Sequence, residues 1–458
     1  NTVFLVLERF NHYSDVLRGK LIRALAERHT VVVLTPDLGA KEAEQFGYFQ
    51  HPNVHYEKIA ARYPRLWWII DKYVRKYFVR GYDDLKTTHY LYYRYPHRFR
   101  DRLLRDMGGL LPKHILTPSV FTWIEMRVVR LSKEFRQLVE KYKPAVVAAG
   151  TAGFGYMPFM TEMVIFSKKY GIPTIAINSS FDNPYAMPKF VRKTDYISVC
   201  HERMKQDVER FFHYSPESIF KAGCLKFDHY FNDRKEGKAW SREAFLKSKG
   251  LDPSRKIIVY ATPTPGTYKP RKEFMRELVR MKREHLLEGD PNILVRLHPF
   301  DAWDVYEEFL GIPGVHIERS GPYRGVDGVT VGPTVEMGED DLVNQTETFM
   351  YGDVLVNYAS TTMIEACIFD TPVVSIAWPD KPGFIFETEV SKALIGTGAA
   401  KLAANPDELC SMVNEYLAYP ERDREARARL VEEYVFFKDG LSYQRTADII
   451  NVIAKTQP

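Results

Sequence analysis

The chain has 458 residues, of which 45% are hydrophobic and 27% charged, and its formal net charge is +5. These values exclude a disordered or collagen-like chain, and the length predicts two domains of roughly 200 residues each. A net charge this small for the length does not identify a partner by itself.

The first half of the chain alternates between apolar runs of strand length and segments with helical spacing. Strands are expected at 3–8, 30–36, 53–59, 145–151, 174–180, 196–200 and 219–223, with a helix at 15–28. This alternation is typical of a parallel sheet with helices on both faces. We therefore predict a Rossmann-like domain over 1–230, interrupted by a basic, aromatic, helical insertion at 62–143 that ends in helical sequence from 118.

The insertion begins with a dense mixture of aromatic and basic residues. Between residues 62 and 105 there are twelve Lys or Arg and four Asp, an excess of eight positive charges. The charges are either solvated over packed aromatics, or they form a surface for anionic lipid or a lipid-linked acceptor. The run at 67–80 mixes Trp, Tyr, Lys and Arg as interfacial helices do. No RNA-binding motif is present, so we expect no nucleic-acid partner.

The second half repeats the alternation after a polar, weakly periodic segment at 227–240, which we interpret as a domain linker. Strands are expected at 256–263, 292–299, 315–320, 353–360 and 372–378, with helices at 270–285, 303–310, 361–369, 406–419, 421–436 and 441–456. A second Rossmann-like domain is therefore predicted over 240–436. Residues 437–458 are expected to form a helix that packs back on the first domain. The fold class is α/β, with two parallel-sheet domains in tandem.

Polar groups follow several strands of the second half. Ligands of open α/β sheets bind outside the carboxyl ends of the strands, and hydroxyls, imidazole and helix starts suit a phosphate ester. Thr362 and Glu365 have the spacing of a capping box, which leaves Ser360 and Thr361 as better ligand candidates. Arg296 either faces the ligand or forms an ion pair at the edge of the core. The full donor-side set is Thr262, Pro263, Arg296, His298, Pro299, Ser360, Thr361, Thr362 and Glu365.

The strand ends of the first half supply candidates for the acceptor side. A transferase needs a base for the acceptor hydroxyl or a nucleophile for the donor, and we favour Asp182, then Glu8. Asp182 also suits an Asx turn before Pro184. The glycine-rich loop with Gly150, Thr151 and Gly153, and the nearby His12, are expected to lie at the acceptor.

Two motifs of the second half resemble a known class of enzymes. RLHP at 296–299 and YASTTMIEACIFDTPVVSI at 358–376 are similar to the donor half of GT-B glycosyltransferases of bacterial surface polysaccharides. IFKAGCLKFDHY at 219–230 resembles the segment that ends the first domain in many such enzymes, and FFKDGLSYQRTADII at 436–450 is similar to the carboxy-terminal helix that closes such chains. The groups with these motifs include sialyltransferases, Kdo transferases and CDP-glycerol polyol-phosphate transferases.

The resemblance implies a GT-B fold with two domains facing across a cleft, and a nucleotide-sugar donor that is a cytidine nucleotide such as CMP-Kdo. It implies that His298, Ser360 and Thr361 contact the donor phosphate, that His298 takes part in catalysis, and that Thr262 lies near the nucleotide. The product would belong to capsule, O-antigen or lipopolysaccharide, made on a glycan or lipid-linked glycan acceptor. A CDP-glycerol-type transferase, a nucleotide-sugar 2-epimerase and a non-catalytic nucleotide- or glycan-binding module remain alternatives.

Three sequence features that are absent bear on cofactors and on location: a Cys-x-x-Cys pair, a DxD metal motif and a long apolar window. The four cysteines form no Cys-x-x-Cys pair and suit a reducing compartment. No DxD motif flanked as a metal site is present, so we expect neither a metal nor a cofactor beyond the nucleotide co-substrate. No window of 18 uncharged apolar residues occurs, so we expect a cytoplasmic protein, at most peripheral on the inner membrane.

Overall fold

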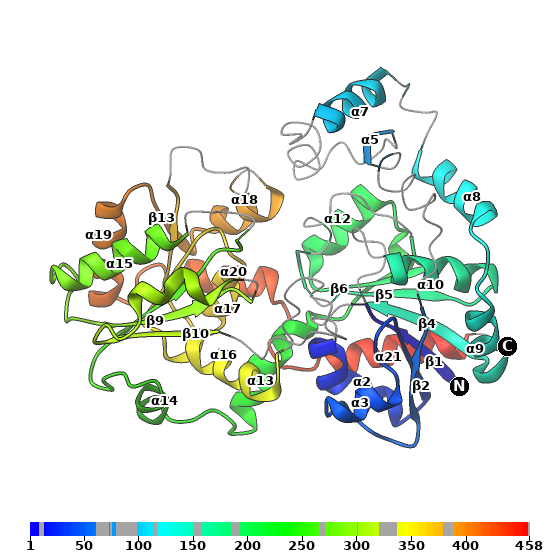
Figure 1. The fold of residues 1–458 in the computed structure, drawn as a ribbon, viewed down its shortest axis with the longest axis horizontal. Helices are drawn as coiled ribbons and strands as arrows, with labels where there is room; N and C mark the ends of the chain where they lie inside the picture. The colour runs from blue at the N-terminus through cyan, green and yellow to red at the C-terminus, as the bar shows by residue number, and fades with distance from the viewer. Residues whose placement is uncertain are drawn as a thin grey trace. The chain divides into compact units, whose positions relative to one another are not determined.

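The structure is a computed structural model, and its chain divides into two compact units (Figure 1). Unit 1 comprises Asn1–Lys226 and Leu441–Pro458, and unit 2 comprises Phe227–Gly440. The residues that the structure describes are 1–8, 13–60, 73, 76–78, 99–110, 112, 117–150, 158–178, 180–182, 184, 193–265, 271–299, 301–319, 337–378, 386 and 388–456.

Unit 1 is built on a sheet of seven parallel strands in the order β3-β2-β1-β4-β5-β6-β7. Its strands are β1 (Thr2–Val6), β2 (Thr30–Thr35), β3 (Val54–Lys58), β4 (Pro144–Gly150), β5 (Thr174–Ile177), β6 (Tyr196–Val199) and β7 (Ile219–Lys221). The central strands are apolar on both faces because helices cover both sides of the sheet.

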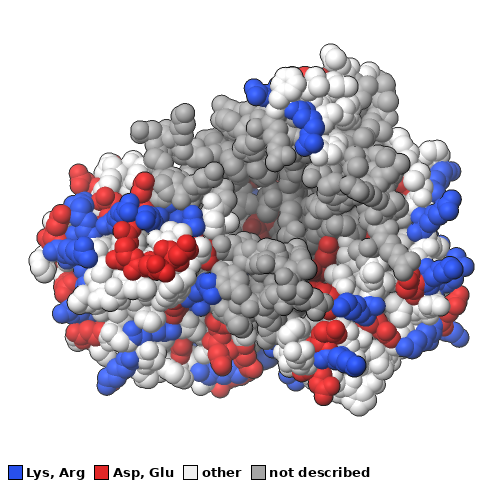
Figure 2. All heavy atoms as spheres, in the orientation of Figure 1, with Lys and Arg blue, Asp and Glu red and all other residues white. Residues whose placement is uncertain are grey.

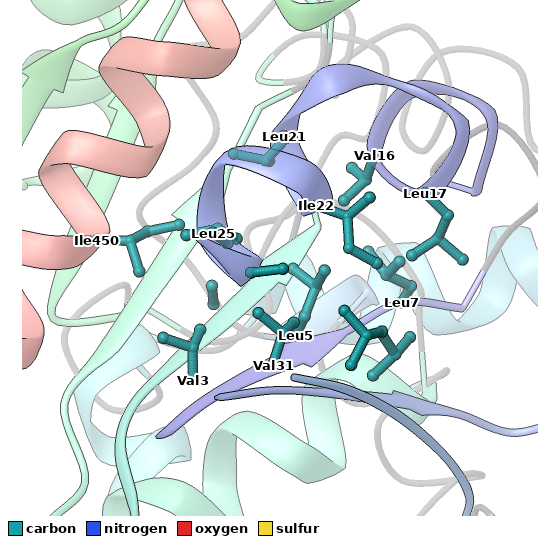
Figure 3. Close-up of a cluster of buried hydrophobic side chains, with 14 of the residues drawn as sticks. Val3, Leu5, Leu7, Val16, Leu17, Leu21, Ile22, Leu25, Val31 and Ile450 are labelled. Atoms are coloured by element: carbon teal, nitrogen blue, oxygen red, sulfur yellow. The ribbon is translucent and has the colours of Figure 1, made fainter. Parts of the chain in front are cut away.

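The helices of unit 1 form two layers. One face of the sheet packs against α2 (Lys20–Ala26) and the returning C-terminal helix α21 (Ser442–Lys455), where Leu25 and Ile450 meet Val3 and Val31 (Figure 3). The other face meets α9 and α10, with Phe135 against Phe4 and Phe166. The remaining helical elements are η1 (Tyr13–Arg18), α3 (Ala40–Gln45), α5 (Lys76–Phe78), α7 (Phe99–Leu110), α8 (Pro118–Val128), α9 (Lys133–Tyr142), α10 (Pro158–Lys169), α12 (Glu202–Phe212), η4 (Pro216–Ser218) and η5 (Leu225–Phe227).

Unit 2 contains six parallel strands in the order β10-β9-β8-β11-β12-β13. The strands are β8 (Ile257–Ala261), β9 (Asn292–Leu297), β10 (Val315–Arg319), β11 (Val354–Asn357), β12 (Val373–Ile376) and β13 (Ala400–Ala403). The helices are α13 (Asp228–Lys235), α14 (Arg242–Ser248), α15 (Lys272–Arg283), η6 (Trp303–Phe309), α16 (Glu339–Tyr351), α17 (Thr362–Ile368), α18 (Glu389–Gly396), α19 (Pro406–Ala418) and α20 (Arg424–Tyr434). An apolar core lies between one face of this sheet and α15, η6 and α19.

Several predicted elements differ from the structure. The segment 227–240, predicted as a linker, contains α13, which packs on α16; its Asp233 accepts a hydrogen bond from Thr346 at 3.0 Å. The helical stretch 118–143 is two helices, because Ser132 caps a new helix by accepting from the backbone N–H of Phe135 at 3.0 Å. Strand β13 was not predicted, since four residues containing two alanines give no strand pattern.

Candidate functional site

The candidate donor residues of unit 2 lie at one edge of the sheet. Strands β9, β8 and β11 are neighbours and parallel, so their carboxyl ends share that edge. His298 follows β9, Thr262 follows β8, and Ser360 and Thr361 follow β11. Adjacent strands are roughly 4.8 Å apart, which separates the β9 and β11 ends by about 10 Å.

The β8 and β9 ends are tied together by a buried carboxylate that sequence reasoning did not single out. Asp301 is fully buried and accepts hydrogen bonds from Thr262 Oγ1 at 3.1 Å and Tyr306 Oη at 2.9 Å. Arg271 pairs with it through Nε and Nη2, both at 2.6 Å. The backbone N–H of His298 donates to Thr262 Oγ1 at 2.8 Å. An aspartate three residues after a strand-end histidine was the only signal available in the sequence.

The turn after β11 is strained and internally bonded. Ala359 has φ of 43°, a left-handed conformation that a residue with a Cβ adopts at a cost. Its backbone N–H donates to Ser375 Oγ at 3.1 Å. Ser360 Oγ accepts from the N–H of Thr362 at 3.3 Å, and Thr362 Oγ1 accepts from Asn357 Nδ2 at 3.2 Å. Ser360, Thr361 and Thr362 are all partly exposed.

The capping box predicted from Thr362 and Glu365 is wrong. Glu365 is buried and accepts hydrogen bonds from Tyr230 Oη at 2.5 Å and Gln345 Nε2 at 2.8 Å. Its carboxylate therefore joins α17 to α13 and α16 instead of closing the start of its own helix. The donor-binding role of Glu365 stays a prediction.

Arg296 also differs from its predicted donor-binding role. Its Nη1 lies 2.9 Å from Glu318 Oε1, and both side chains are buried. Lys249 Nζ lies 2.6 Å from the other Glu318 oxygen, and Asn344 donates to Oε1 at 2.9 Å. Burial raises the pKa of Glu318, but the positive charges of Arg296 and Lys249 lower it by more. The pKa of Glu318 therefore lies below its ordinary value. The ion pair at the edge of the core, the alternative left open by the sequence, is what the structure contains.

Pro263 and Pro299 follow the donor strands directly. Pro263 is buried beside Thr262, and Pro299 is partly exposed beside His298. Each proline fixes its own φ and favours extended backbone in the residue before it. They shape the two loops without offering a donor to a ligand.

The structure describes some of the acceptor-side candidates of unit 1. Glu8 follows β1, Gly150 ends β4 and Asp182 follows β5, and these parallel strands are neighbours. Glu8 Oε2 accepts from the backbone N–H of Met160 at 3.1 Å, which places its carboxylate at the start of α10. Asp182 accepts a hydrogen bond from Ser180. His12, Thr151 and Gly153 lie outside the described residues.

Two further polar residues of this edge were not predicted. Asn178, directly after β5, is buried and donates through Nδ2 to the carbonyl of Ser198 at 2.5 Å. His201, just after β6, is fully buried, and its Nδ1 accepts from the N–H of Met204 at 3.2 Å. Burial lowers the pKa of His201 to about 3, which keeps the ring neutral. Each is a single polar residue that follows an apolar strand, and this pattern alone does not identify a functional residue in one sequence.

In the ranges described above, no group of three or more His, Cys, Asp or Glu is arranged to hold a metal ion. The acidic run 339–341 forms the first turn of α16, where Asp341 accepts from the N–H of Gly338 at 3.0 Å. Over the described helices, none is both long and apolar enough to cross a membrane.

Comparisons with known proteins agree with this architecture. The family model of CDP-glycerol:poly(glycerophosphate) glycerophosphotransferases matches residues 125–313, less than half of the chain. A UDP-GlcNAc 2-epimerase from Neisseria meningitidis, bound to UDP-GlcNAc, has a TM-score of 0.55 at 9% identity, covering 99% of this chain and 100% of that one. A glycosyltransferase from Rickettsia africae has a TM-score of 0.51 at 11% identity, covering 100% and 99%.

A third solved structure of similar fold is that of a polymerase. The wall teichoic acid polymerase TagF, in a variant soaked with CDPG, has a TM-score of 0.50 at 12% identity and covers 99% of this chain and 89% of that one. No curated protein sequence matches the chain. The chain has the GT-B fold, as the sequence predicted. Over residues 125–313 it is similar to the CDP-glycerol glycerophosphotransferases, which favours this alternative over a CMP-Kdo donor.

Proposed function

We propose that the protein transfers a polyol phosphate, such as glycerophosphate, from a cytidine diphosphate donor to a hydroxyl of a growing surface polymer. The observation that carries this proposal is the family match over residues 125–313, which includes Thr262, His298 and Pro299. The placement of His298, Ser360 and Thr361 at one sheet edge supports a phosphate-binding role for them.

The proposed reaction makes and breaks one bond to phosphorus. The acceptor oxygen bonds to the phosphorus that carries the polyol, the bond from that phosphorus to the bridging oxygen breaks, and CMP leaves with the electron pair. The acceptor proton must pass to a base. Asp182 and Glu8 are the candidates, as the sequence predicted, and the carboxylate of each accepts one hydrogen bond in this structure. His298 and the hydroxyls of Ser360 and Thr361 would donate to the negative charge on the donor phosphates.

Phosphorus NMR tests the reaction class directly. The protein is incubated with CDP-glycerol and a glycerophosphate oligomer, and in parallel with CMP-Kdo and with UDP-GlcNAc. The proposal predicts a new phosphodiester resonance and stoichiometric CMP with CDP-glycerol alone. Conversion of UDP-GlcNAc to its 2-epimer, or sugar transfer from CMP-Kdo without a new phosphodiester, would contradict it. His298→Ala is the inactive control for catalysis at this edge.

We also propose that α7 contacts an anionic lipid surface on which the polymer is carried. Phe99, Leu103, Met107 and Leu110 recur along one face of α7 and are 76%, 50%, 48% and 85% exposed. The opposite face carries Gly108, which is buried so closely against α5 that an added Cβ would meet the carbonyl of Tyr77 at 2.1 Å. The helix therefore packs through its small residue and turns its large apolar residues outward.

The charge around α7 fits the same surface. Arg100 and Arg102 are exposed on α7, and basic groups border uncharged surface where this helix lies (Figure 2). An apolar stripe with flanking arginines is the pattern of a helix lying in a membrane interface. The excess of positive charge in the sequence around α7 favours anionic over neutral lipid.

Flotation with vesicles of equal parts phosphatidylglycerol and phosphatidylcholine tests the surface. Phe99→Ser combined with Leu110→Ser removes two apolar anchors worth about 1.5–3 kcal/mol each when buried, so binding should fall at least tenfold. Leu310→Ser, at an apolar residue of unit 2 that is 48% exposed, is the matched control and should bind as the wild type does. Equal binding by the α7 variant, or by pure phosphatidylcholine vesicles, would contradict the proposal.

A further inference from the structure

The buried carboxylate of Asp301 is the centre of a hydrogen-bond network. Its Oδ1 accepts from Arg271 Nε and Nη2, both at 2.6 Å, and from the backbone N–H of Ala302 at 3.0 Å. Its Oδ2 accepts from Thr262 Oγ1 at 3.1 Å and Tyr306 Oη at 2.9 Å. Five donors around one fully buried carboxylate form a complete network, which is the condition under which a buried charge is tolerated.

The network reaches the candidate ligand site through a single hydroxyl. Thr262 Oγ1 gives its hydrogen to Asp301 and receives the backbone N–H of His298 at 2.8 Å. The hydroxyl thus joins the end of β8 to the end of β9 while pointing its donor inward. Thr262 is 4% exposed, so it acts between protein groups and not as a ligand to the donor.

The backbone of Asp301 also closes the loop that carries His298. The backbone N–H of Asp301 donates to the carbonyl of His298 at 2.7 Å. Asp301 is therefore held through both its backbone and its carboxylate. Pro299 fixes φ within this turn. The backbone of His298 is consequently held by protein groups at both its N–H and its carbonyl.

We propose that Asp301 is a positioning residue, which holds His298 in the orientation that binds the donor phosphate by way of the Thr262 hydroxyl. This inference rests on the proposed function, because it assigns the nucleotide to the His298 edge. It predicts that ligand affinity depends on a side chain that touches no ligand.

Four variants separate positioning from general stability. Asp301→Asn puts an amide N–H among donors, and Thr262→Val keeps the shape of threonine without its hydroxyl. Thr262→Ser restores the hydroxyl. Asp370→Asn is the matched control, because Asp370 pairs with the fully buried Arg427 at 2.8 Å but precedes β12, at the amino end of the sheet.

Calorimetric titration with CMP and CDP and hydrogen exchange at the His298 amide are measured on all four full-length variants. Asp301→Asn and Thr262→Val should weaken nucleotide binding at least about tenfold, with faster His298 exchange, since a buried donor loses its acceptor. Thr262→Ser should stay within about threefold of the wild type, and Asp370→Asn should leave both readouts unchanged, as expected for separated sites.

The outcomes distinguish the two claims. If the wild type binds cytidine nucleotides and Asp301→Asn and Thr262→Val bind them equally well, the positioning role is overturned while the proposed function stands. If affinity falls as much in Asp370→Asn as in Asp301→Asn, the effect is general destabilisation and the positioning role is again overturned. If the wild type binds neither nucleotide, the proposed function fails and this inference fails with it.

Discussion

Arg296 and Glu318 form an ion pair of 2.9 Å, and their side chains are 8% and 10% exposed. The pair links neighbouring strands β9 and β10, in register with each other. Two further residues contact the Glu318 carboxylate: Lys249, at the C-terminal end of α14, and Asn344 of α16. Arg296 is thus a structural residue one strand position before the loop that carries His298.

Loss of one partner of this pair should be costly. Arg296→Met leaves Glu318 buried with less compensation and should lower the free energy of unfolding by about 3–5 kcal/mol. The double variant Arg296→Met, Glu318→Gln should recover part of that loss, because the unpaired charge is gone. Urea unfolding of both variants measures this, and strictly additive losses would show that the two residues do not act as a pair.

Strain at Ala359 gives a second prediction. Ala359 adopts φ of 43° after β11, and a Cβ in left-handed backbone costs roughly 1–2 kcal/mol. Ala359→Gly removes that cost but adds flexibility to the unfolded chain, so the net gain should be up to about 1 kcal/mol. Ala428→Gly, at an exposed position inside α20, should instead cost about 1 kcal/mol. Thermal unfolding compares the two, and a loss of stability in Ala359→Gly would refute the strain.

Two glycines with similar backbone angles test the packing at the end of unit 2. Gly440 has φ of 71° and an added Cβ would lie 2.7 Å from Asn232 Oδ1, whereas Gly237 has φ of 65° and open space around it. Gly237→Ala should cost about 1 kcal/mol for its backbone alone. Gly440→Ala should cost about 2 kcal/mol or more, since Asn232 must also move. Equal unfolding midpoints for the two variants would contradict the close approach.

The buried histidine His201 predicts a pH dependence of stability. Its folded-state pKa is about 3, against an ordinary value of 6.5, so the unfolded chain binds the proton more readily between these values. Stability should therefore fall as pH drops below about 6.5, by about 2 kcal/mol at pH 5 from this group alone. His201→Asn keeps an acceptor for the Met204 N–H and does not titrate, so it should flatten this part of the profile.

The pH dependence of unfolding stability, measured on the wild type and on His201→Asn, tests this prediction. Unfolding curves between pH 5 and pH 7 are compared for the wild type and His201→Asn under the same salt. Identical slopes would mean that His201 titrates normally and is more accessible than its position after β6 implies.

The sequence was sufficient for the alternation of strands and helices and for the sheet edge that gathers His298, Thr262 and Ser360. Strand patterns are local, and parallel strands share an edge by topology alone. The partners of individual side chains were not predictable in the same way. Glu365 fits a local capping box by spacing, yet its hydrogen-bond partner Tyr230 is 135 positions away. Likewise Arg296 is bonded to Glu318, which belongs to a different strand.

A thermal-shift panel of CMP, CDP, UDP and GDP on the wild type and His298→Ala tests whether a cytidine nucleotide binds beside His298. A ligand that binds the native state alone raises the melting temperature by mass action. We predict the largest shift with a cytidine nucleotide, and its loss in His298→Ala, whose melting temperature without ligand should match that of the wild type. A larger shift with UDP, or a cytidine shift that survives in His298→Ala, would contradict a cytidine diphosphate donor held at the edge where β8, β9 and β11 end.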